Sequence, residues 1–412
     1  MGKEMKALYN ILGILFIPFF YIFARKKGLK GDIKERLVLY NPKVKNPIWF
    51  HCASVGELNV AKPLIKYFSK KYPVLVTVFS PRGKPYAEEL FPGVEVRAVP
   101  FDISFFIRKF LKIYDPRMLI LVEGEFWHNL VTVSSKRIKV LSVNTRISPK
   151  SFRTYMKYFF FYRPIFSSIS LFLARSEKDV AYLRKLVDDK KKVILCGDLK
   201  LVSSIPEKEV PLKTGGKTVI VAGSTHFPEE NILLSVFKKI KKDYPDTVLI
   251  IAPRHLERVK NISITVEKYG FSYSLRSNTD TLDKDVYIVD TIGELSGLYR
   301  YATVVFVGGT FAPVGGHNIL EPALFNKPVI IGKHYEKIKS IFSFLSKKGA
   351  VVSVSSEEEL EDWIRKAIEG EFKPKIDIVK EQERVLDCYL KNIQKQWRKD
   401  EPDRADKTVL YR

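Results

Sequence analysis

The stretch Ser203–Lys217, SSIPEKEVPLKTGGK, interrupts an otherwise regular alternation of short apolar runs and longer amphipathic segments. Two prolines, two glycines and mixed charge so close together are typical of a linker. The stretch divides the 412 residues into halves of ordinary domain size. We therefore expect one domain at 31–205 and a second at 206–375. Residues 1–30 would form a membrane anchor, and residues 376–412 a C-terminal helix and tail.

Both halves predict the same architecture. Amphipathic stretches such as Leu58–Lys70 and Glu177–Leu186 predict helices. Apolar runs predict strands at 48–53, 74–79, 118–122, 140–143, 171–174 and 193–196, and again at 219–222, 248–252, 286–289, 303–307, 329–331 and 351–354. Nearly continuous apolar strands separated by helices are typical of a parallel sheet covered on both faces. The fold class is therefore α/β, with two doubly wound domains whose ligands lie beyond the carboxyl ends of the strands.

The N-terminus carries an uncharged apolar run, Ala7–Ala24, that leads directly into Arg25, Lys26 and Lys27. Its length is near the minimum for a membrane-spanning helix, and Asn10 and Pro18 lie within it. No cleavage site separates it from the basic residues, which argues against a signal peptide. We expect a membrane anchor, either spanning or interfacial, with the remainder on the cytoplasmic face. An ordinary buried helix is the alternative.

The amino-acid composition indicates what kind of partner and compartment suit the protein. Lysine and arginine outnumber aspartate and glutamate by 70 to 46, a net charge of +24 that favours an anionic partner. The basic residues are dispersed and match no recognition motif, which argues against nucleic acid. The three cysteines, Cys52, Cys196 and Cys388, are far apart. Their number and spacing argue against a disulfide framework or a zinc site and suit buried thiols in a reducing compartment.

Carboxylates follow two strands of the first half. Glu57 opens a helix after the first strand, and Glu123 and Glu125 follow another. Acidic groups that meet at one sheet edge raise each other's proton affinity, which suits a general base. For Glu57 the alternative is a first-turn acid that complements the helix dipole. Lys200 follows the last strand of this half, where it is either solvated charge or a group that stabilises developing negative charge.

Four strands of the second half end in small or polar residues, at 223–226, 253–255, 290–295 and 308–318. One such loop is an ordinary turn, but four at one sheet edge indicate a nucleotide site, with a phosphate near backbone N–H groups and a ribose near a carboxylate. The Walker, GxSxG and GxGxxG motifs are absent. The histidines lack metal-ligand spacing, so we expect no metal or cofactor.

These motifs occur in one order along the chain: ASVGE at 53–57, SPRG at 80–83, EFW at 125–127, AGSTH at 222–226, APRH at 252–255, GEL at 293–295, and GGT with GGHN and LEP between 308 and 322. Together they resemble the 3-deoxy-D-manno-octulosonic acid (Kdo) transferases of lipid A assembly. The resemblance covers nearly the whole chain. It implies the GT-B glycosyltransferase fold with a membrane-attached N-terminus and two Rossmann-like domains facing a cleft. The domain at 31–205 would bind the acceptor, and the domain at 206–375 would bind CMP-Kdo.

The resemblance implies an inverting transfer of Kdo from CMP-Kdo to the 6′-hydroxyl of the tetraacylated, bisphosphorylated lipid A precursor at the cytoplasmic face of the inner membrane. Glu57 matches the general base, and Glu125 and Lys200 match groups that support the transition state. Glu123 is the alternative to Glu125, and Asp198 stands where the family has asparagine. The residues matching substrate contacts are Pro253, Arg254, Ile292, Gly293, Glu294, Gly316, His317, Asn318, Ile319, Leu320 and Glu321.

Two other functions remain open on the sequence. One is a different GT-B enzyme, such as a UDP-sugar transferase or epimerase. The other is a non-catalytic, membrane-attached module that binds phosphorylated lipid. The aromatic stretch Tyr155–Phe166, YMKYFFFYRPIF, has two readings of its own: a surface for acyl chains or the membrane interface, or a core helix.

Overall fold

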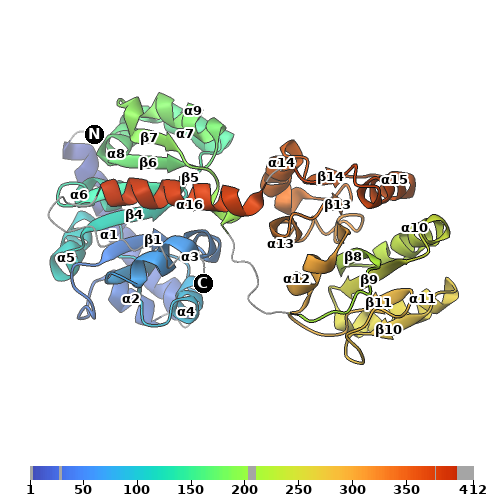
Figure 1. Ribbon diagram of the computed structural model, residues 1–412. Coiled ribbons are helices and arrows are strands. Elements are labelled where there is room, and N and C mark those ends of the chain that lie inside the picture. The colour runs from blue at the N-terminus through green and yellow to red at the C-terminus, as the bar shows by residue number, and fades with distance from the viewer. Residues whose placement is uncertain (1–2, 27–29, 203–209, 376, 397–412) are drawn as a thin grey trace. The chain divides into compact units, whose positions relative to one another are not determined.

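The computed structural model describes residues 3–26, 30–202, 210–375 and 377–396 (Figure 1). The chain forms two compact α/β units. The first takes the described residues up to Val202 and those from Glu383 onward, and the second takes those between. Of the expected linker Ser203–Lys217, residues 203–209 lie outside the described residues. Lys213 forms a β-bridge with Thr281, so the end of that stretch belongs to the second unit.

The first unit has a seven-stranded sheet, all of whose neighbouring strands are parallel. The strands are β1 (Ile48–Cys52), β2 (Val74–Val78), β3 (Glu95–Ala98), β4 (Met118–Val122), β5 (Lys139–Thr145), β6 (Leu171–Ala174) and β7 (Val193–Leu195), in the order β3-β2-β1-β4-β5-β6-β7. The helices are α1 (Lys3–Lys26), α2 (Lys30–Arg36), α3 (Val55–Ser69), α4 (Gly83–Leu90), α5 (Ser104–Tyr114), α6 (His128–Ser134), α7 (Pro149–Lys157), α8 (Phe159–Ser168), α9 (Glu177–Leu186) and most of α16 (Ile378–Lys395).

The second unit repeats the design with strands β8 (Thr218–Thr225), β9 (Thr247–Pro253), β10 (Tyr273–Leu275), β11 (Val286–Ile288), β12 (Val304–Val307), β13 (Val329–Ile331) and β14 (Val351–Ser353). Their order is β10-β11-β9-β8-β12-β13-β14. Its helices are α10 (Glu229–Asp243), α11 (Val259–Lys268), α12 (Leu295–Leu298), α13 (Leu320–Leu324), α14 (Lys339–Lys347) and α15 (Glu357–Ile368). The predicted α/β class with two doubly wound sheets is confirmed.

Every predicted strand is present, and of the strands described the sequence missed β3 and β10, two of the four edge strands. β3 reads EVRA and alternates charged with apolar residues, and β10 is three residues long. Edge strands need not be apolar on both faces, so they lack the continuous run by which the central strands were found. In the centre, Phe50 of β1 pairs with Val76 on one side and Ile120 on the other, and all three are fully buried.

The strand order places the two sites. In the first sheet, β2 and β3 lie on one side of β1, and β4 begins the strands on its other side. In the second sheet, β9 lies on one side of β8 and β12 on the other. The order in which strands are added to the sheet therefore changes direction at these two places. Loops beyond such neighbouring strands diverge to opposite faces and leave room for a ligand at the carboxyl ends. Glu57 follows β1, Glu125 follows β4, His226 follows β8 and His317 follows β12. These four residues thus lie at the two switch points of their own units, whereas Lys200, Arg254 and Ile292 follow β7, β9 and β11.

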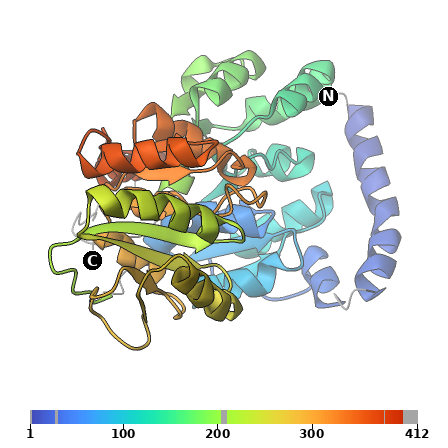
Figure 2. The same cartoon turned by 90° about the vertical axis from the view of Figure 1, so that its right-hand side faces the viewer.

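Helix α1 lies on the outside of the first unit (Figure 2). Asn10, a polar residue within the apolar run, accepts the backbone N–H of Ser104 at 2.8 Å. The Tyr9 hydroxyl donates to buried Asp102 at 2.6 Å, and the Phe20 ring packs edge-on against Phe101. These contacts occupy one side of the helix. Large apolar side chains on the other side are exposed: Leu8, Ile11, Leu12, Ile14, Leu15, Phe16, Phe19, Tyr21 and Ile22.

Within the part of the chain that the structure describes, no helix combines the length and apolarity needed to cross a membrane. The aromatic stretch 155–166 is divided between α7 and α8, with Ile165 and Phe166 fully buried and Phe160 exposed. Most of its rings pack against the core of the first unit.

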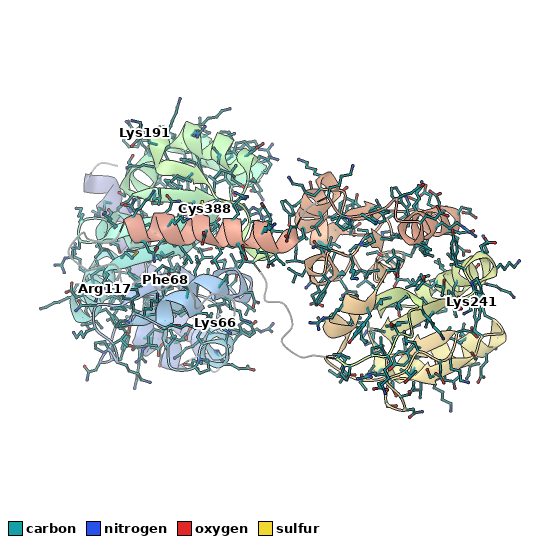
Figure 3. All side chains as sticks on the ribbon, viewed as in Figure 1. Lys66, Phe68, Arg117, Lys191, Lys241 and Cys388 are labelled. Atoms are coloured by element: carbon teal, nitrogen blue, oxygen red, sulfur yellow. A yellow bond between two sulfur atoms is a disulfide. The ribbon has the colours of Figure 1, made fainter. Side chains whose placement is uncertain are left out.

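The C-terminal helix α16 completes the core of the first unit. Val385, Tyr389 and Ile393 are fully buried among residues of α3 and the sheet. Figure 3 shows Cys388 on this helix, while lysines such as Lys66 and Lys191 project outward. The Tyr389 hydroxyl donates to the carbonyl oxygen of Gly197 at 2.7 Å, just after β7.

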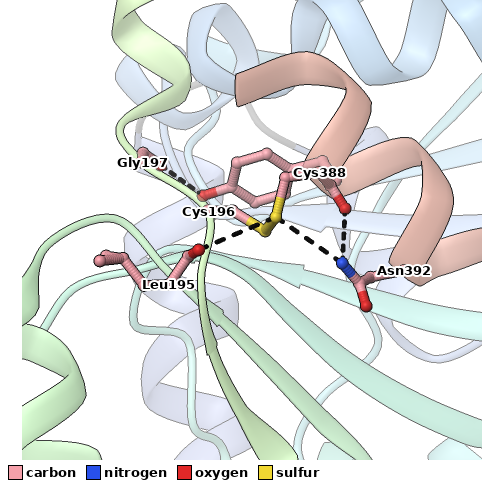
Figure 4. The surroundings of a disulfide bond; sticks show 6 residues. Leu195, Cys196, Gly197, Cys388 and Asn392 are labelled. Atoms are coloured by element: carbon pink, nitrogen blue, oxygen red, sulfur yellow. Dashed lines mark hydrogen bonds between the residues drawn. A yellow bond between two sulfur atoms is a disulfide. The ribbon is translucent and has the colours of Figure 1, made fainter. Parts of the chain in front are cut away.

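Cys388 is joined to Cys196 by a disulfide (Figure 4). The expectation of three unpaired thiols was therefore wrong, and only Cys52 is a free thiol. The two partners lie 192 residues apart in sequence and meet, with Cα atoms 5.4 Å apart, because α16 returns to the end of β7. The spacing of the cysteines in the sequence does not indicate that these two are paired.

The disulfide yields a testable expectation. A bridge that closes so long a loop stabilises mainly by restricting the unfolded chain, by about 2–4 kcal/mol. Cys388→Ser should lower the free energy of unfolding by about this amount in denaturant titrations without reductant. The wild type in reductant, which lacks the bridge but keeps both cysteines, is the matched control and should lose the same stability. Stability of Cys388→Ser equal to that of the wild type, with wild-type stability unaffected by reductant, would show that the bridge contributes nothing.

Candidate active site

Glu57 lies in the first turn of α3 and is 9% exposed. Its carboxylate accepts the backbone N–H of Ala53 at 2.7 Å and the Ser54 hydroxyl at 3.1 Å, while Ser54 caps the helix. Its place in the first turn agrees with the helix-dipole interpretation of this residue. The same bonds hold the carboxylate in one position beside the carboxyl end of β1, which a general base also requires.

Glu123 and Glu125 follow β4, and they differ in their partners. Glu123 adopts a left-handed backbone with φ of 58°, and its carboxylate lies 3.6 Å from the Lys200 ammonium. Glu125 accepts the Trp127 indole N–H at 2.9 Å. Lys200 thus pairs with Glu123 rather than with Glu125, which separates the two carboxylates that the sequence left as alternatives.

Lys200 is placed by its neighbours. The Asp198 carboxylate accepts the backbone N–H of Lys200 at 3.0 Å and so caps the short turn Leu199–Leu201. Asn144, at the end of β5, accepts the N–H of Leu199 at 2.9 Å. Aspartate and asparagine cap turns equally well, so Asp198 preserves the local geometry where the family has asparagine.

The carboxylates raise each other's proton affinity. Burial, and then the negative charge of Glu125, raise the pKa of Glu57 to about 7, although the hydrogen bonds from Ala53 and Ser54 oppose the shift. Burial likewise raises the pKa of Glu125, with the charge of Glu123 adding to it. At neutral pH Glu57 therefore exchanges a proton readily, as a general base must.

In the second unit, a buried carboxylate shapes the glycine-rich loop. Glu229, at the start of α10, is 0% exposed. Its two oxygens accept five backbone N–H groups at 2.8–3.2 Å, those of His226, Gly309, Thr310, Phe311 and Ala312. These N–H groups point at a protein carboxylate, so the expected anion site is not formed by this part of the loop. Glu229 was not identified from the sequence.

Removing that carboxylate should destabilise the second unit strongly. Glu229→Ala leaves five N–H groups without their acceptor, three of them buried, and each buried group costs about 1–3 kcal/mol. We expect the free energy of unfolding to fall by at least about 3 kcal/mol, measured by calorimetry on the full chain. Glu267→Ala, on the exposed face of α11, should change it by no more than about 0.5 kcal/mol. A loss of less than about 1 kcal/mol for Glu229→Ala would contradict the assignment.

The glycine pairs are explained by close packing inside the unit. A Cβ on Gly309, whose φ is 69°, would lie 2.9 Å from the His317 ring. A Cβ on buried Gly316, whose φ is 89°, would lie 2.8 Å from Ile338. The Gly316 N–H is also used, because it donates to the carbonyl of Gly309. A side chain at Gly316 would therefore disturb the loop itself as well as any ligand beside it.

The remaining predicted substrate contacts fall into two linked loops. Asn318 donates to Glu321 at 2.9 Å, and Glu321 also accepts the Ser296 hydroxyl. Glu294 pairs with Arg276 at 3.0 Å, and neighbouring Ile292 is 84% exposed. Helix α13 begins at Leu320. The side chains of Ile319 and Leu320 are buried in the core, so only their backbone atoms can face a ligand.

Basic and imidazole groups gather near the same edge. Pro253 ends β9, exposed Arg254 follows it, and the Nε2 atoms of His226 and His317 lie 2.8 Å apart. Arg254 and Lys337 both act on the charge of His317. The sequence singled out Arg254 and His317 but missed Lys337, which reaches the site from a separate turn at 336–338. Among the described residues, no group of three or more His, Cys, Asp or Glu side chains could hold a metal ion.

Comparisons with known proteins agree on one family. Residues 31–203 match the family model described as 3-deoxy-D-manno-octulosonic-acid transferase. The chain is 33% identical to the 3-deoxy-D-manno-octulosonic acid transferase of Aquifex aeolicus over 85% of its own length and 93% of that protein. It is 31% identical to the protein of the same name from Haemophilus influenzae, over 78% of each.

Solved structures with lower identity resemble the fold. A UDP-N-acetylglucosamine 2-epimerase is 13% identical, with a TM-score of 0.51 over 87% of this chain and 99% of that one. The glycotransferase of kitacinnamycin gives the same TM-score and identity over 87% and 100%. At this identity the likeness concerns the fold alone, and it confirms the GT-B architecture of two parallel-sheet α/β domains.

Proposed function

The chain belongs to the family of 3-deoxy-D-manno-octulosonic acid (Kdo) transferases and is a glycosyltransferase of lipid A and lipopolysaccharide biosynthesis; from this premise we propose a donor, an acceptor and a mechanism. The donor is CMP-Kdo, and the acceptor is the 6′-hydroxyl of the tetraacylated, bisphosphorylated disaccharide precursor. The observation that carries the mechanism is a buried carboxylate, Glu57, whose pKa is raised to about 7 at the switch point of the first sheet.

In the proposed step, Glu57 takes the proton of the acceptor hydroxyl as the hydroxyl oxygen bonds to the anomeric carbon of Kdo. The bond from that carbon to the phosphate oxygen breaks, and CMP leaves with the electron pair. Attack opposite the leaving group inverts the anomeric configuration. Glu125 supports the step by keeping the pKa of Glu57 near neutrality, and Lys200 supplies positive charge at the same edge. Lys200 is oriented for this by its ion pair with Glu123.

The second unit is the proposed site of the donor. Arg254 offers a planar guanidinium for phosphate, and the Glu321 carboxylate is an acceptor suited to ribose hydroxyls. Exposed Ile292, next to Gly293 and Glu294, offers an apolar surface for the base. The other proposed contacts are Pro253, Gly316, His317, Asn318, Ile319 and Leu320, the last two through their backbone atoms.

Helix α1 is proposed to lie in the plane of the cytoplasmic face of the inner membrane. Its Tyr9 and Asn10 contacts fix one side to the first unit, and the exposed apolar side is then free to enter the lipid. Arg25, Lys26 and Lys27 follow the apolar run, and the net charge of +24 favours an anionic surface. A membrane-bound enzyme meets its acylated acceptor where that acceptor resides.

One experiment tests the function. Purified protein is incubated with CMP-Kdo and the tetraacyl precursor, and the lipid is weighed by mass spectrometry, with CMP release followed in parallel. A mass increase by one or more Kdo units supports the proposal. No increase, or calorimetric binding of UDP in preference to CMP, would reject it in favour of another sugar-nucleotide enzyme.

A further inference from the structure

His226 and His317 form a direct contact that the proposed mechanism does not use. Their Nε2 atoms are 2.8 Å apart and the ring planes differ by only 3°. An N···N contact of this length needs one nitrogen that carries hydrogen and one that does not. The pair can therefore be neutral, or hold one extra proton in total, but it cannot remain in contact with both rings fully protonated.

The pair is held in place from both sides. The backbone N–H of His226 donates to buried Glu229, and the His317 ring lies against Gly309, where any side chain would collide with it. Two chain segments 91 residues apart thus fix one hydrogen bond. Such rigid placement exceeds what a turn requires, and it is typical of groups positioned for a ligand.

The surroundings of the pair are positive. Arg254 approaches from the end of β9, where the ring centre of His255 lies 5.6 Å from that of His226, and Lys337 approaches from the turn at 336–338. Three charged groups lie on the other side of the pair. The Arg258 guanidinium and the Glu230 carboxylate neutralise each other in an ion pair at 2.8 Å. The Glu229 carboxylate is saturated by backbone N–H groups. In the part of the chain described, Arg254 and Lys337 have no carboxylate within ion-pair distance. The site therefore has the positive charge that attracts an anion.

Burial and these neighbouring cations lower the pKa of His317 to about 4, and burial lowers that of His226. Both rings are therefore neutral at pH 7 in the free protein. An arriving phosphate would oppose the cations and raise the pKa of the pair.

We propose that His226 and His317 receive the phosphate of the cytidine nucleotide as a proton-sharing pair, and that the pair takes up a proton when CMP binds. This inference rests on the proposed donor. The phosphate of CMP-Kdo is a diester with one negative charge, whereas that of released CMP carries close to two, with a second pKa of about 6. The extra proton matches the charge that develops on the leaving oxygen and so favours departure of CMP.

The sign of the pH dependence follows. The pair binds more protons in the CMP complex than in the free protein, so the affinity for CMP rises as the pH falls through the pKa of the bound pair. Below about pH 6 protonation of CMP itself opposes the gain. Affinity should therefore rise between pH 8 and 6, by up to about tenfold per pH unit. Cytidine, which has no phosphate, should bind with an affinity independent of pH.

The experiment is calorimetric titration of the full-length protein with CMP at pH 7 in HEPES and in Tris, which differ in ionisation enthalpy. The difference in heat gives the protons exchanged, and we expect an uptake of about one per CMP. If the histidines took no part, CMP binding would instead release protons, so the sign of the proton exchange distinguishes the two cases. His226→Gln and His317→Gln should abolish the uptake, and His334→Gln, an imidazole outside the pair, should retain it.

Each result decides between the possibilities. CMP binding without buffer-dependent heat, or unchanged uptake in both variants, would overturn the inference and leave the proposed function standing. Absence of CMP binding with retention of UDP binding would overturn the donor assignment and this inference with it. If either variant fails to fold, the affinity of the unmodified protein for CMP between pH 8 and 6 decides: a flat profile contradicts proton uptake.

Discussion

Replacing Glu57 by glutamine is expected to lower the rate of Kdo transfer by about 10³-fold, because a neutral amide cannot take the hydroxyl proton. Glutamine keeps the shape of the side chain, so CMP-Kdo should bind as before. Product formation measured by mass spectrometry, together with calorimetric binding of CMP, separates these two effects.

The pH profile sharpens this prediction. Because the base must be deprotonated and burial raises its pKa to about 7, kcat/KM should fall about tenfold per pH unit below 7. The residual activity of Glu57→Gln should lack that limb. Glu89→Gln, an exposed carboxylate on α4, is the matched control and should keep both rate and profile.

Loss of α3 capping is the competing explanation, since Glu57 also bonds Ala53 and Ser54. Ser54→Ala removes the cap without removing the carboxylate. If Ser54→Ala loses as much activity as Glu57→Gln at equal stability, the carboxylate is structural and the base lies elsewhere.

Substituting Leu12, Phe16 and Phe19 together by serine is expected to weaken membrane binding by about 10²-fold or more. The three side chains are 58%, 59% and 71% exposed and share one face of α1 at helical spacing. Each would lose about 1–2 kcal/mol of transfer into lipid, and none contributes to the contacts that dock the helix. Sedimentation with vesicles of phosphatidylethanolamine and phosphatidylglycerol measures the effect.

Two comparisons make the result specific. Ile264→Ser removes an exposed apolar side chain from the second unit and should leave binding unchanged. Replacing Phe160, the exposed ring of α8, tests the competing membrane surface that the sequence suggested. If Phe160→Ser releases the protein from vesicles and the α1 variant does not, α8 rather than α1 contacts the lipid.

The sequence predicted much of the fold because central parallel strands carry an unmistakable pattern. Strands such as Met118–Val122 and Val329–Ile331 are buried on both faces, and each was located with its observed bounds. Edge strand β3 escaped because Glu95 and Arg97 face each other in an ion pair rather than joining an apolar run. A pattern of apolar residues therefore does not reveal a buried strand whose charged side chains are paired.

Only those features of the site that lie within one loop could be predicted from the sequence. Glu57 and Glu125 could be identified from their places after strands, but the pairing of Lys200 with Glu123 depends on where Asn144 and Asp198 hold a distant turn. Glu229 was missed because a first-turn glutamate looks like an ordinary helix-dipole acid. Its role depends on N–H groups some eighty residues further along the chain. The same holds for the disulfide between Cys196 and Cys388.

The return of α16 to the first unit bears on the order in which a ribosome can complete this protein. The first unit lacks Val385, Tyr389 and Ile393 of its core until the last part of the chain has emerged. The second unit is a continuous segment, 203–382, and has all of its residues earlier. Domains generally fold as units during synthesis, from the N-terminus onward. We therefore expect the first unit to begin folding first and to finish last. The apolar surface that α16 covers would stay exposed while the second unit is synthesised.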